Sequence, residues 1–546
     1  MLFCFTPVRT FLKPKNFSFL GEKTNFLSHE KSFELNPNHK MNIRDTRLQL
    51  LLFFVLLSSY ALAQENKPEE KEIPKAQVFD SKQSVTIDGK VINLNAKAGT
   101  LELKDENNKP IALFGYTAYF KEGAGKERPI VFAYNGGPGS SSYWLHMGIM
   151  GPKRIVVDDP NYNQGAPYQL VNNEFSILDV ADVVMMDPVG TGLSIPIGDA
   201  TGKDFWGVDQ DIRTVSLFIM QFLKEHGRLN SPKYILGESY GTFRNAGVMN
   251  YLLGRGYALN GVIMVSAVFD LRTLFFAPNE DLPYTVYLPT IAATSWYHGK
   301  VANKGSDLPA FVQTVREFTE KEYAPALFQG NRISAQEKSS MAQKLENFTG
   351  ISAEVWNRAN LKITPDEYYQ ELLRSEGLTV GRLDSRYKGI NLDLMSMAAF
   401  TDPQSDAISP AYTMGFLDYY HGSLGVSKDL LYATSAYSKE GFKWDWTHQG
   451  NNFWGADAAV TTLPDMEEAL SKDPNVKVLI MNGYYDLATV FHGVEHSISR
   501  MELHQAALDR VIMTYYEAGH MMYTHLPSAK LFREDLKKFI LDTQRK

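Results

Sequence analysis

Two kinds of hydrophobic pattern divide the chain. Between residues 84 and 120, in SVTIDGKVINLNAKAGTLEL and IALFGYTAYF, apolar and polar positions alternate around Asp-Gly and Asn-Asn turns. Alternation with a period of two predicts antiparallel strands. The second pattern consists of continuous apolar runs of strand length, which is typical of strands buried on both faces. These runs lie at 129–134, 182–187, 234–238, 261–268, 476–482 and 511–519.

Helical periodicity separates several of these runs. Between residues 205 and 223 apolar side chains recur at spacings of three and four, which places them on one stripe of a helix. Strands that alternate with such helices predict an α/β fold whose mainly parallel sheet is covered by helices on both faces. The stripe consists of Val208, Ile212, Val215, Ile219 and Phe222.

The alternation stops near residue 270 and resumes near residue 460. The stretch between is rich in aromatic residues at first and then in charged helical patterns such as TPDEYYQELLRSEG. We expect residues 64–270 and 460–546 to form the two parts of the core, and residues 271–459 to form a largely helical insertion that covers a site as a lid. A separate packed domain without a role at the site is the alternative.

The sequence from Met41 has the layout of a secretory signal peptide. Arginines precede an apolar stretch, and Ala61-Leu62-Ala63 provides a small-x-small cleavage signal. We therefore expect residues 41–63 to be removed near Ala63 and residues 1–40 to be an upstream extension. A membrane anchor is the alternative, but the apolar run is short for a bilayer span. The pattern predicts a periplasmic or secreted protein with no stable membrane insertion after cleavage.

Composition narrows the class of protein further. The net charge of -7 is modest and the sequence has no block of lysine and arginine, which argues against nucleic acid as a partner. The single cysteine, Cys4, lies in the upstream stretch, so the mature protein contains no disulfide. This favours a bacterial protein with a large core over a small extracellular domain held by disulfides.

The stretch YILGESYGTF places Ser239 between two glycines, where a buried strand turns into a helix. A G-x-S-x-G pattern in this context indicates a nucleophile elbow, in which a tight turn exposes the serine hydroxyl at the carboxyl end of the sheet. Without that context the pattern would also fit an ordinary glycine-rich loop.

A serine hydroxyl needs a base to take its proton, and the base needs a third group to orient it. Asp486 comes just beyond one buried strand, and His520 just beyond the next, in the order Ser, Asp, His that this architecture uses. We predict these three residues as the catalytic triad. His525 is the alternative base, and a plain turn is the alternative role for Asp486.

Acyl transfer also requires hydrogen-bond donors for the developing oxyanion. The stretch FAYNGGPGSSS follows the run at 129–134, and its consecutive glycines leave backbone N–H groups unobstructed. We predict the amides of Gly137 and Tyr240 as the oxyanion hole. A flexible turn without function is the alternative.

The segments NGGPGSSS, MDPVGTGLS, LGESYGT, NGYYDLAT and YEAGHMMY, in this order and spacing, resemble the serine carboxypeptidase family of the α/β-hydrolase superfamily. The resemblance implies an α/β-hydrolase fold, a secreted bacterial-type member, a peptide substrate and no metal or cofactor. It also implies the triad and the oxyanion hole named above. In that family the residues at the positions of Asn135, Gly136 and Glu238 bind the terminal carboxylate of the substrate.

One departure from the family pattern concerns this carboxylate site. A carboxyl group binds a carboxylate only when it is protonated, because two like charges repel each other. In the family a second glutamate shares the proton of the residue at Glu238, but Ile149 occupies its position here. The family cysteine after NGGPG is replaced by Ser140. The sequence therefore does not decide whether the protein is a strict carboxypeptidase or whether its activity has an acidic pH optimum.

Three rival interpretations remain. HGVEH at residues 492–496 matches the H-x-x-E-H pattern of zinc proteases, although Gly493 weakens the helix that such a site needs. An esterase, acyltransferase or aminopeptidase would use the same triad on the same scaffold, because a fold does not determine its substrate. A binding protein without activity is the third, and an intact triad argues against it.

Overall fold

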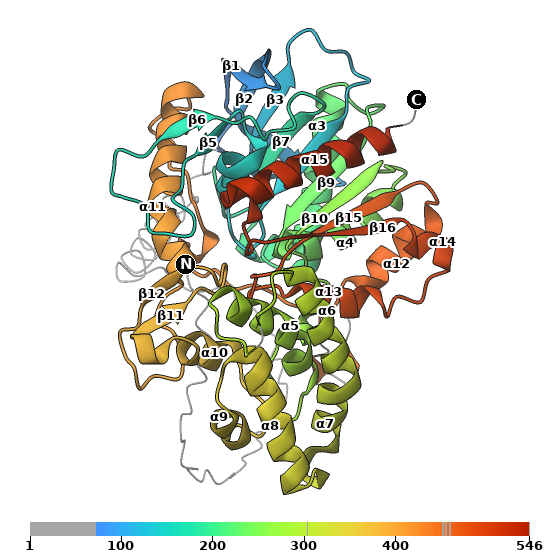
Figure 1. The fold of residues 1–546 in the computed structure, drawn as a ribbon. Coiled ribbons are helices and arrows are strands. Elements are labelled where there is room, and N and C mark those ends of the chain that lie inside the picture. Colours follow the sequence, from blue (N-terminus) through green and yellow to red (C-terminus); the bar gives the residue numbers. More distant parts are fainter. Residues whose placement is uncertain (1–72, 303, 450–451, 454–455, 458–459, 545–546) are drawn as a thin grey trace, which may run out of the picture. The chain divides into compact units, whose positions relative to one another are not determined.

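The computed structural model describes residues 73–544 apart from 303, 450–451, 454–455 and 458–459 (Figure 1). The expected extension 1–40 and signal peptide 41–63 lie outside the described residues. Pro74–Lys546 forms one unit by its internal contacts. None of the helices in the described part of the chain combines the length and apolar character needed to cross a bilayer.

A ten-stranded sheet organises this unit, in the order β1-β2-β3-β7-β4-β9-β10-β15-β16 with the short β8 paired to β3. The pairs from β1 to β7 are antiparallel, and those from β7 to β16 are parallel. The structure thus confirms the α/β-hydrolase fold with its mainly parallel sheet. The strands are β1 (Val78–Ile87), β2 (Lys90–Lys104), β3 (Pro110–Lys121), β4 (Ile130–Tyr134), β7 (Asp182–Asp187), β8 (Ile195–Pro196), β9 (Lys233–Glu238), β10 (Gly261–Val265), β15 (Lys477–Gly483) and β16 (Val511–Tyr516).

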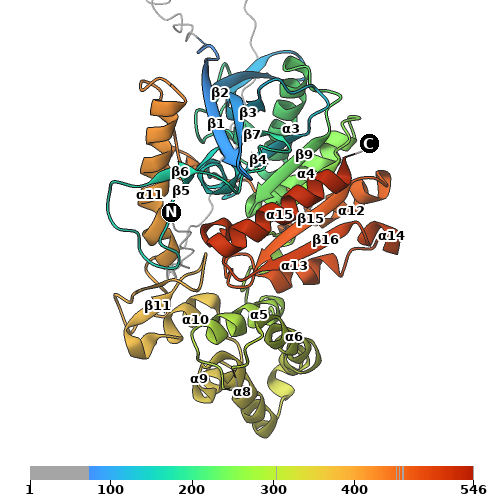
Figure 2. The same ribbon diagram turned by 45° about the horizontal axis from the view of Figure 1, so that its top comes forward.

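Helices connect the parallel strands and fill the long segment between β10 and β15. Figures 1 and 2 both show α6–α9 (yellow-green to yellow) away from the sheet. The longer helices near the sheet are α3 (Val208–Glu225), α4 (Tyr240–Leu253), α12 (Leu463–Lys472), α13 (Phe491–Ile498) and α15 (Leu526–Thr543). Those between β10 and β15 are α5 (Leu282–Tyr297), α6 (Leu308–Phe318), α7 (Ala324–Gln329), α8 (Ala335–Thr349), α9 (Ala353–Arg358), α10 (Pro365–Glu371) and α11 (Pro403–Asp418). Short pieces complete the chain: α2 (Tyr143–Leu145), α14 (Gln505–Leu508) and the strand pairs β5 (Lys153–Ile155) with β6 (Leu170–Asn172), β11 (Leu378–Val380) with β12 (Lys388–Ile390), and β13 (Asn452–Phe453) with β14 (Ala456–Asp457).

The inner parallel strands β4, β7, β9, β10 and β15 are buried on both faces because helices cover both sides of the sheet, whereas the edge strand β16 is only partly buried. Along β4, Val131 and Ala133 belong to a core shared with α11 and α15. Ile130 and Phe132 point the other way, into a core shared with α3, α4 and α12. This double burial explains why the inner parallel strands appear in the sequence as continuous apolar runs.

Two of the apolar runs extend beyond the strands that they form. The run 261–268 is a strand only to Val265, because Ser266 adopts a positive φ of 49° and turns the chain. The run 511–519 is a strand only to Tyr516. Beyond both ends, the chain leaves the sheet at its carboxyl edge, where the candidate site lies.

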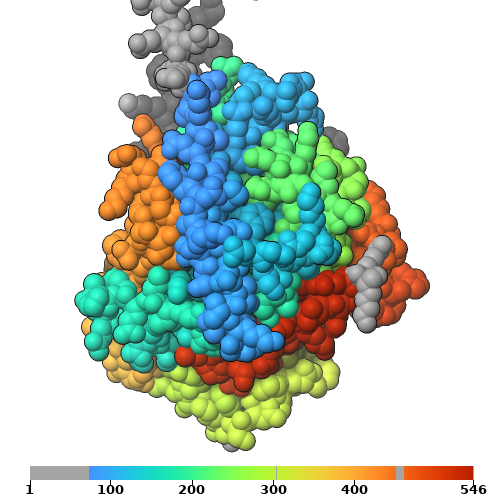
Figure 3. All heavy atoms as spheres, turned by 90° about the horizontal axis from the view of Figure 1, so that it is seen from above, coloured from blue at the N-terminus to red at the C-terminus, as the bar shows by residue number. Residues whose placement is uncertain are grey.

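The segment between β10 and β15 packs in two places. Helices α5, α8 and α10 share a core of their own, which also takes in Leu487 and Val490 from the loop after β15. Helix α11 instead packs on the sheet, in the same core as α15. Figure 3 shows α11 (orange) beside the blue N-terminal strands on the face viewed from above.

Candidate active site

Ser239 occupies a strained turn between β9 and α4. Its backbone angles are φ 60° and ψ -129°, a region that residues other than glycine rarely adopt. The Ser239 N–H donates to the carbonyl of Val265 at the end of β10 (2.9 Å), which anchors the turn to the neighbouring strand. This is the strand-turn-helix geometry of a nucleophile elbow.

Close backbone approach requires glycine at position 237, two residues before the serine, and at position 136 in the loop after β4. A Cβ atom on Gly237 would lie 2.2 Å from the carbonyl oxygen of Gly241, so strand and helix could not meet with a side chain there. On the other side of the turn, a Cβ on Gly136 would lie 2.5 Å from the Tyr240 nitrogen. The glycine-rich loop after β4 therefore lies directly against the elbow.

Asp486 and His520 meet at the carboxyl edge of the sheet. His520 Nδ1 lies 2.8 Å from Asp486 Oδ2. The carboxylate is fully buried and accepts hydrogen bonds from the amides of Ala488 (2.8 Å) and Thr489 (3.0 Å). A base whose ring nitrogen is held by a fixed carboxylate has the orientation that a triad needs.

Thr489 is a contributor that sequence reasoning missed. Its hydroxyl lies 2.8 Å from Asp486 Oδ2 and 3.2 Å from His520 Nδ1, and it also bonds the carbonyl of Ser266 (2.9 Å). The only signal in the sequence is its place three residues after Asp486. That spacing suits a turn as well as it suits a catalytic contact.

His520 is held at the same edge of the sheet as the Ser239 turn. Its carbonyl accepts a 2.6 Å hydrogen bond from the Ser266 hydroxyl, one residue after the Val265 that holds Ser239. Burial alone would lower the pKa of His520, but the Asp486 carboxylate outweighs it and raises that pKa above its ordinary value. The alternative base, His525, bonds Ser528 through Nδ1 (2.8 Å) at the start of α15.

The predicted oxyanion donors are oriented by the same contact between loop and elbow. Gly137 has φ 108°, a value that favours glycine. Within the described residues, neither the Gly137 N–H nor the Tyr240 N–H donates to a protein acceptor. Both amides are thus available for a developing negative charge, and Gly137 and Tyr240 remain our predicted oxyanion hole.

Asn135 and Glu238 form a buried pair beside Ser239. The Asn135 side-chain amide donates to Glu238 Oε1 (2.9 Å), and the amide oxygen of Asn135 accepts from the Leu145 N–H (3.0 Å). Burial raises the pKa of Glu238 to about 7, although His520, Tyr523 and Asn135 each favour its charged form. Glu238 therefore holds a proton at weakly acidic pH.

A tyrosine that sequence reasoning did not assign, Tyr523, lies near Glu238. Ile149 is buried in the apolar core, as its side chain requires. Tyr523 is buried near Glu238, close enough that each group shifts the pKa of the other. Glu238 Oε2 and the Tyr523 hydroxyl are both buried without a hydrogen-bond partner among the described residues. Two unpaired polar atoms at such a place fit a site that is completed by a ligand.

The HGVEH segment forms an ion-pair cluster. His492 Nδ1 lies 2.7 Å from Glu495, and Glu495 binds Arg316 through two contacts of 2.5 and 3.0 Å. The Tyr515 hydroxyl donates to the same carboxylate. No group of three or more histidine, cysteine, aspartate or glutamate residues in the described part of the chain is placed to hold a metal ion. The geometry therefore gives the zinc-protease interpretation no support.

Comparison with known proteins places most of the chain in one family. The profile of the serine carboxypeptidase family matches residues 87–526. This stretch contains the elbow, the Asp486–His520 pair and the whole segment between β10 and β15.

Individual relatives match shorter stretches. Serine carboxypeptidase-like 8 of Arabidopsis thaliana is 29% identical over 139 residues, which is 25% of this chain and 30% of that protein. Carboxypeptidase Y homolog A of Phaeosphaeria nodorum is 29% identical over 179 residues, or 32% of this chain and 29% of that protein. The chain thus spans less than a third of the length of these relatives. Among solved structures, the prohormone-processing carboxypeptidase Kex1Δp of Saccharomyces cerevisiae aligns with a TM-score of 0.48 and 14% identity, covering 82% of this chain and 92% of that one.

Proposed function

The chain belongs to the serine carboxypeptidase family, and from this premise we propose that it is a serine exopeptidase that releases C-terminal residues from peptides. The observation that carries the proposal is the buried Asn135–Glu238 pair, in which Glu238 directly precedes Ser239 and has one carboxyl oxygen without a hydrogen-bond partner among the described residues. A protonated carboxyl group at this place donates a hydrogen bond to a terminal carboxylate and aligns the last peptide bond with the nucleophile.

The proposed reaction begins with attack of Ser239 Oγ on the carbonyl carbon of the last peptide bond. His520 accepts the serine proton through its second ring nitrogen, because Nδ1 is already engaged with Asp486. The same proton then passes to the leaving amine, and the C-terminal residue departs. Water attacks the acyl-enzyme in the second half with His520 again as base, which releases the shortened peptide and restores Ser239.

Asp486 stabilises the imidazolium that forms during each transfer, and Thr489 holds that carboxylate in place. The amides of Gly137 and Tyr240 donate to the tetrahedral oxyanion. Such donors contribute about 3 kcal/mol each in acyl transfer because they need no reorganisation during the reaction.

Export of the enzyme is part of the proposal. It rests on the arginine-containing start, the apolar stretch and the Ala61-Leu62-Ala63 signal at residues 41–63. We expect the mature protein to begin close to Gln64 and to appear in the periplasmic or culture fraction of a bacterial host. N-terminal sequencing of the purified protein checks this, and a cytosolic protein that retains residues 41–63 would contradict it.

The decisive test compares peptides whose two ends are blocked in turn. We expect amino-blocked peptides with a free C-terminus to lose their last residue, and amidated peptides to resist. The pH dependence has a defined sign: only protonated Glu238 binds a carboxylate, so KM for free acids is lowest below its pKa of about 7 and rises roughly tenfold for each pH unit above it. Mass spectrometry of the products from about pH 4 to 9 measures both effects.

Glu238→Gln is the matched variant, because its amide donates a hydrogen bond at every pH. Its KM for free acids should lose the rise above neutral pH. Ser239→Ala, prepared in parallel, controls for contaminating peptidases. Equal cleavage of amides or simple esters would favour the esterase and acyltransferase alternatives, for which the apolar Ile149 is the supporting observation. A requirement for a free N-terminus would favour an aminopeptidase.

A further inference from the structure

A short stretch of the insertion, residues 382–386, contacts both loops that carry the catalytic pair. On the Asp486 side, the Leu487 N–H donates to the carbonyl of Arg382 (3.0 Å). The carbonyl of Tyr485 accepts from both the amide and the hydroxyl of Ser385, at 3.0 Å each. Asp486 is therefore held on both flanks by the same stretch.

Leu383 and Asp384, in the middle of this stretch, hold the loop that carries His520. The His520 N–H donates to the carbonyl of Leu383 (2.7 Å), and the Gly519 N–H donates to Asp384 Oδ2 (3.0 Å). A Cβ on Gly519 would lie 2.4 Å from the Cβ of Asp384, so only glycine permits this approach. Gly519 is thus explained by a contact with the insertion and not by the triad itself.

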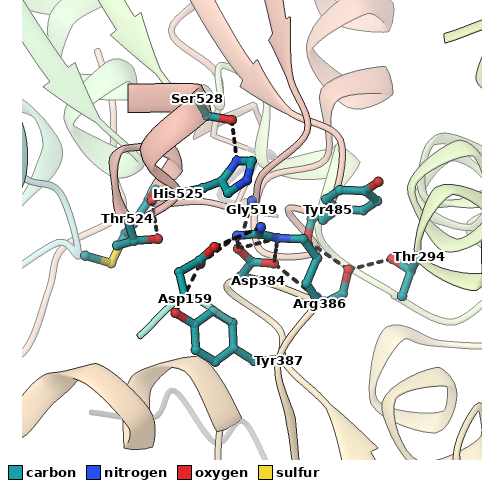
Figure 4. Close-up of polar contacts among 12 residues, drawn as sticks. Asp159, Thr294, Asp384, Arg386, Tyr387, Tyr485, Gly519, Thr524, His525 and Ser528 are labelled. Carbon is teal, nitrogen blue, oxygen red and sulfur yellow. Dashed lines mark hydrogen bonds and ion pairs between the residues drawn. The ribbon is translucent and has the colours of Figure 1, made fainter. Parts of the chain in front are cut away.

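Asp384 is fixed in turn by a buried ion cluster. Arg386 binds Asp384 through Nε (3.0 Å) and Nη2 (2.6 Å), and it binds Asp159 through both terminal nitrogens (2.8 and 3.0 Å). Figure 4 shows the guanidinium between the two carboxylates, with Gly519 beside Asp384. The side chains of these three charged residues are at most 6% exposed. Buried charges of this kind hold a geometry strongly, because breaking one partner leaves the other uncompensated.

The stretch is also anchored to two helices. The Ser385 hydroxyl bonds Thr294 on α5 (2.6 Å), and the Leu383 N–H donates to Asp402 at the start of α11 (2.9 Å). The insertion therefore connects to the catalytic pair through backbone hydrogen bonds and buried charges. Through these contacts the insertion can affect the reaction itself as well as access to the site.

We infer that Asp384, together with Arg386 and Asp159, is a positioning residue for the catalytic pair, so that the insertion sets the alignment of His520 with Asp486. The inference rests on the triad of the proposed function but not on its peptide specificity. A displacement of about 1 Å in a reacting group lowers rates by about a hundredfold. The cluster should therefore act on the chemical step and leave substrate binding unchanged.

Asp384→Asn tests this with little change of shape. We expect kcat per titrated active site, and the rate of labelling by a fluorophosphonate, to fall by roughly ten- to a hundredfold with KM unchanged. The charged groups that act on His520 are Asp486, Glu238 and Arg382. Since Asp486 raises the pKa of His520, a looser pair should also shift the midpoint of the pH profile of labelling downward.

Asp182→Asn is the matched control. Asp182 is a buried carboxylate that binds Arg128 and Arg228, and it begins β7 at the opposite edge of the sheet. The Asp182→Asn variant should be less stable than the wild type but keep the wild-type kcat per active site. Arg386→Lys changes the same ion cluster and replaces Asp384→Asn if that variant does not fold. Active-site titration counts only folded enzyme, so a loss of stability does not lower the measured kcat per active site.

An unchanged rate and pH midpoint in the cluster variants, or an equal loss in Asp182→Asn, would overturn the inference. A wild-type enzyme that labels at Ser239 but does not release C-terminal residues would overturn the proposed function alone. The positioning role would still be measured by the labelling rate. Absence of labelling in the wild type would overturn both.

Discussion

Replacing Ser239 with alanine should lower kcat by about a millionfold, because His520 then has no hydroxyl to activate and the acyl-enzyme cannot form. Measured with an amino-blocked peptide, the loss should appear in kcat, while the dissociation constant of the peptide stays within a few-fold. Fluorophosphonate labelling should disappear as well. The unfolding free energy should change by less than about 1 kcal/mol, since the turn at Ser239 is held by backbone hydrogen bonds.

Ser216→Ala is the control for this variant. Ser216 is a buried serine on α3 whose hydroxyl bonds the Ile212 carbonyl, and its removal should leave kcat unchanged. A Ser239→Ala enzyme that keeps even about a hundredth of the wild-type kcat would identify another nucleophile. The proposed mechanism would then be wrong at its first step.

Asp486→Asn should lower kcat by about ten-thousandfold, which is the second largest expected effect. The carboxylate accepts from His520 Nδ1 and so leaves the second ring nitrogen free to take the serine proton. An amide that donates to Nδ1 stabilises the opposite tautomer, which cannot act as a base. Single-turnover kinetics with an ester and a peptide measure the loss in the acylation step.

Asp473→Asn separates this electronic effect from simple loss of a buried carboxylate. Asp473 also accepts from a backbone amide in a turn, that of Asn475, but it precedes β15, whereas Asp486 follows it. We expect nearly normal kcat in Asp473→Asn. A similar kcat in the two variants would show that Asp486 has no role in the proton transfer.

Part of the fold could be predicted because burial acts on each residue separately. A strand covered on both faces is apolar along most of its length, and five of the six runs correspond to such strands, while the run 511–519 contains the partly buried edge strand β16. Where a strand ends is a different matter. Val265 and Tyr516 end β10 and β16 because the chain turns there to reach the site, and beyond Val265 the apolar character continues through Ala267 and Val268.

The sequence by itself determined the order of the elements and the places of Ser239, Asp486 and His520 at strand ends, because the elbow and the strand ends have local signatures. The tertiary structure alone decided that Tyr523 lies near Glu238, that Glu495 binds Arg316, and that residues 382–386 hold both catalytic loops. These contacts join segments far apart in the chain. Most of those made by residues 382–386 use backbone groups, which every residue type except proline provides in full, so no local pattern of side chains could reveal them.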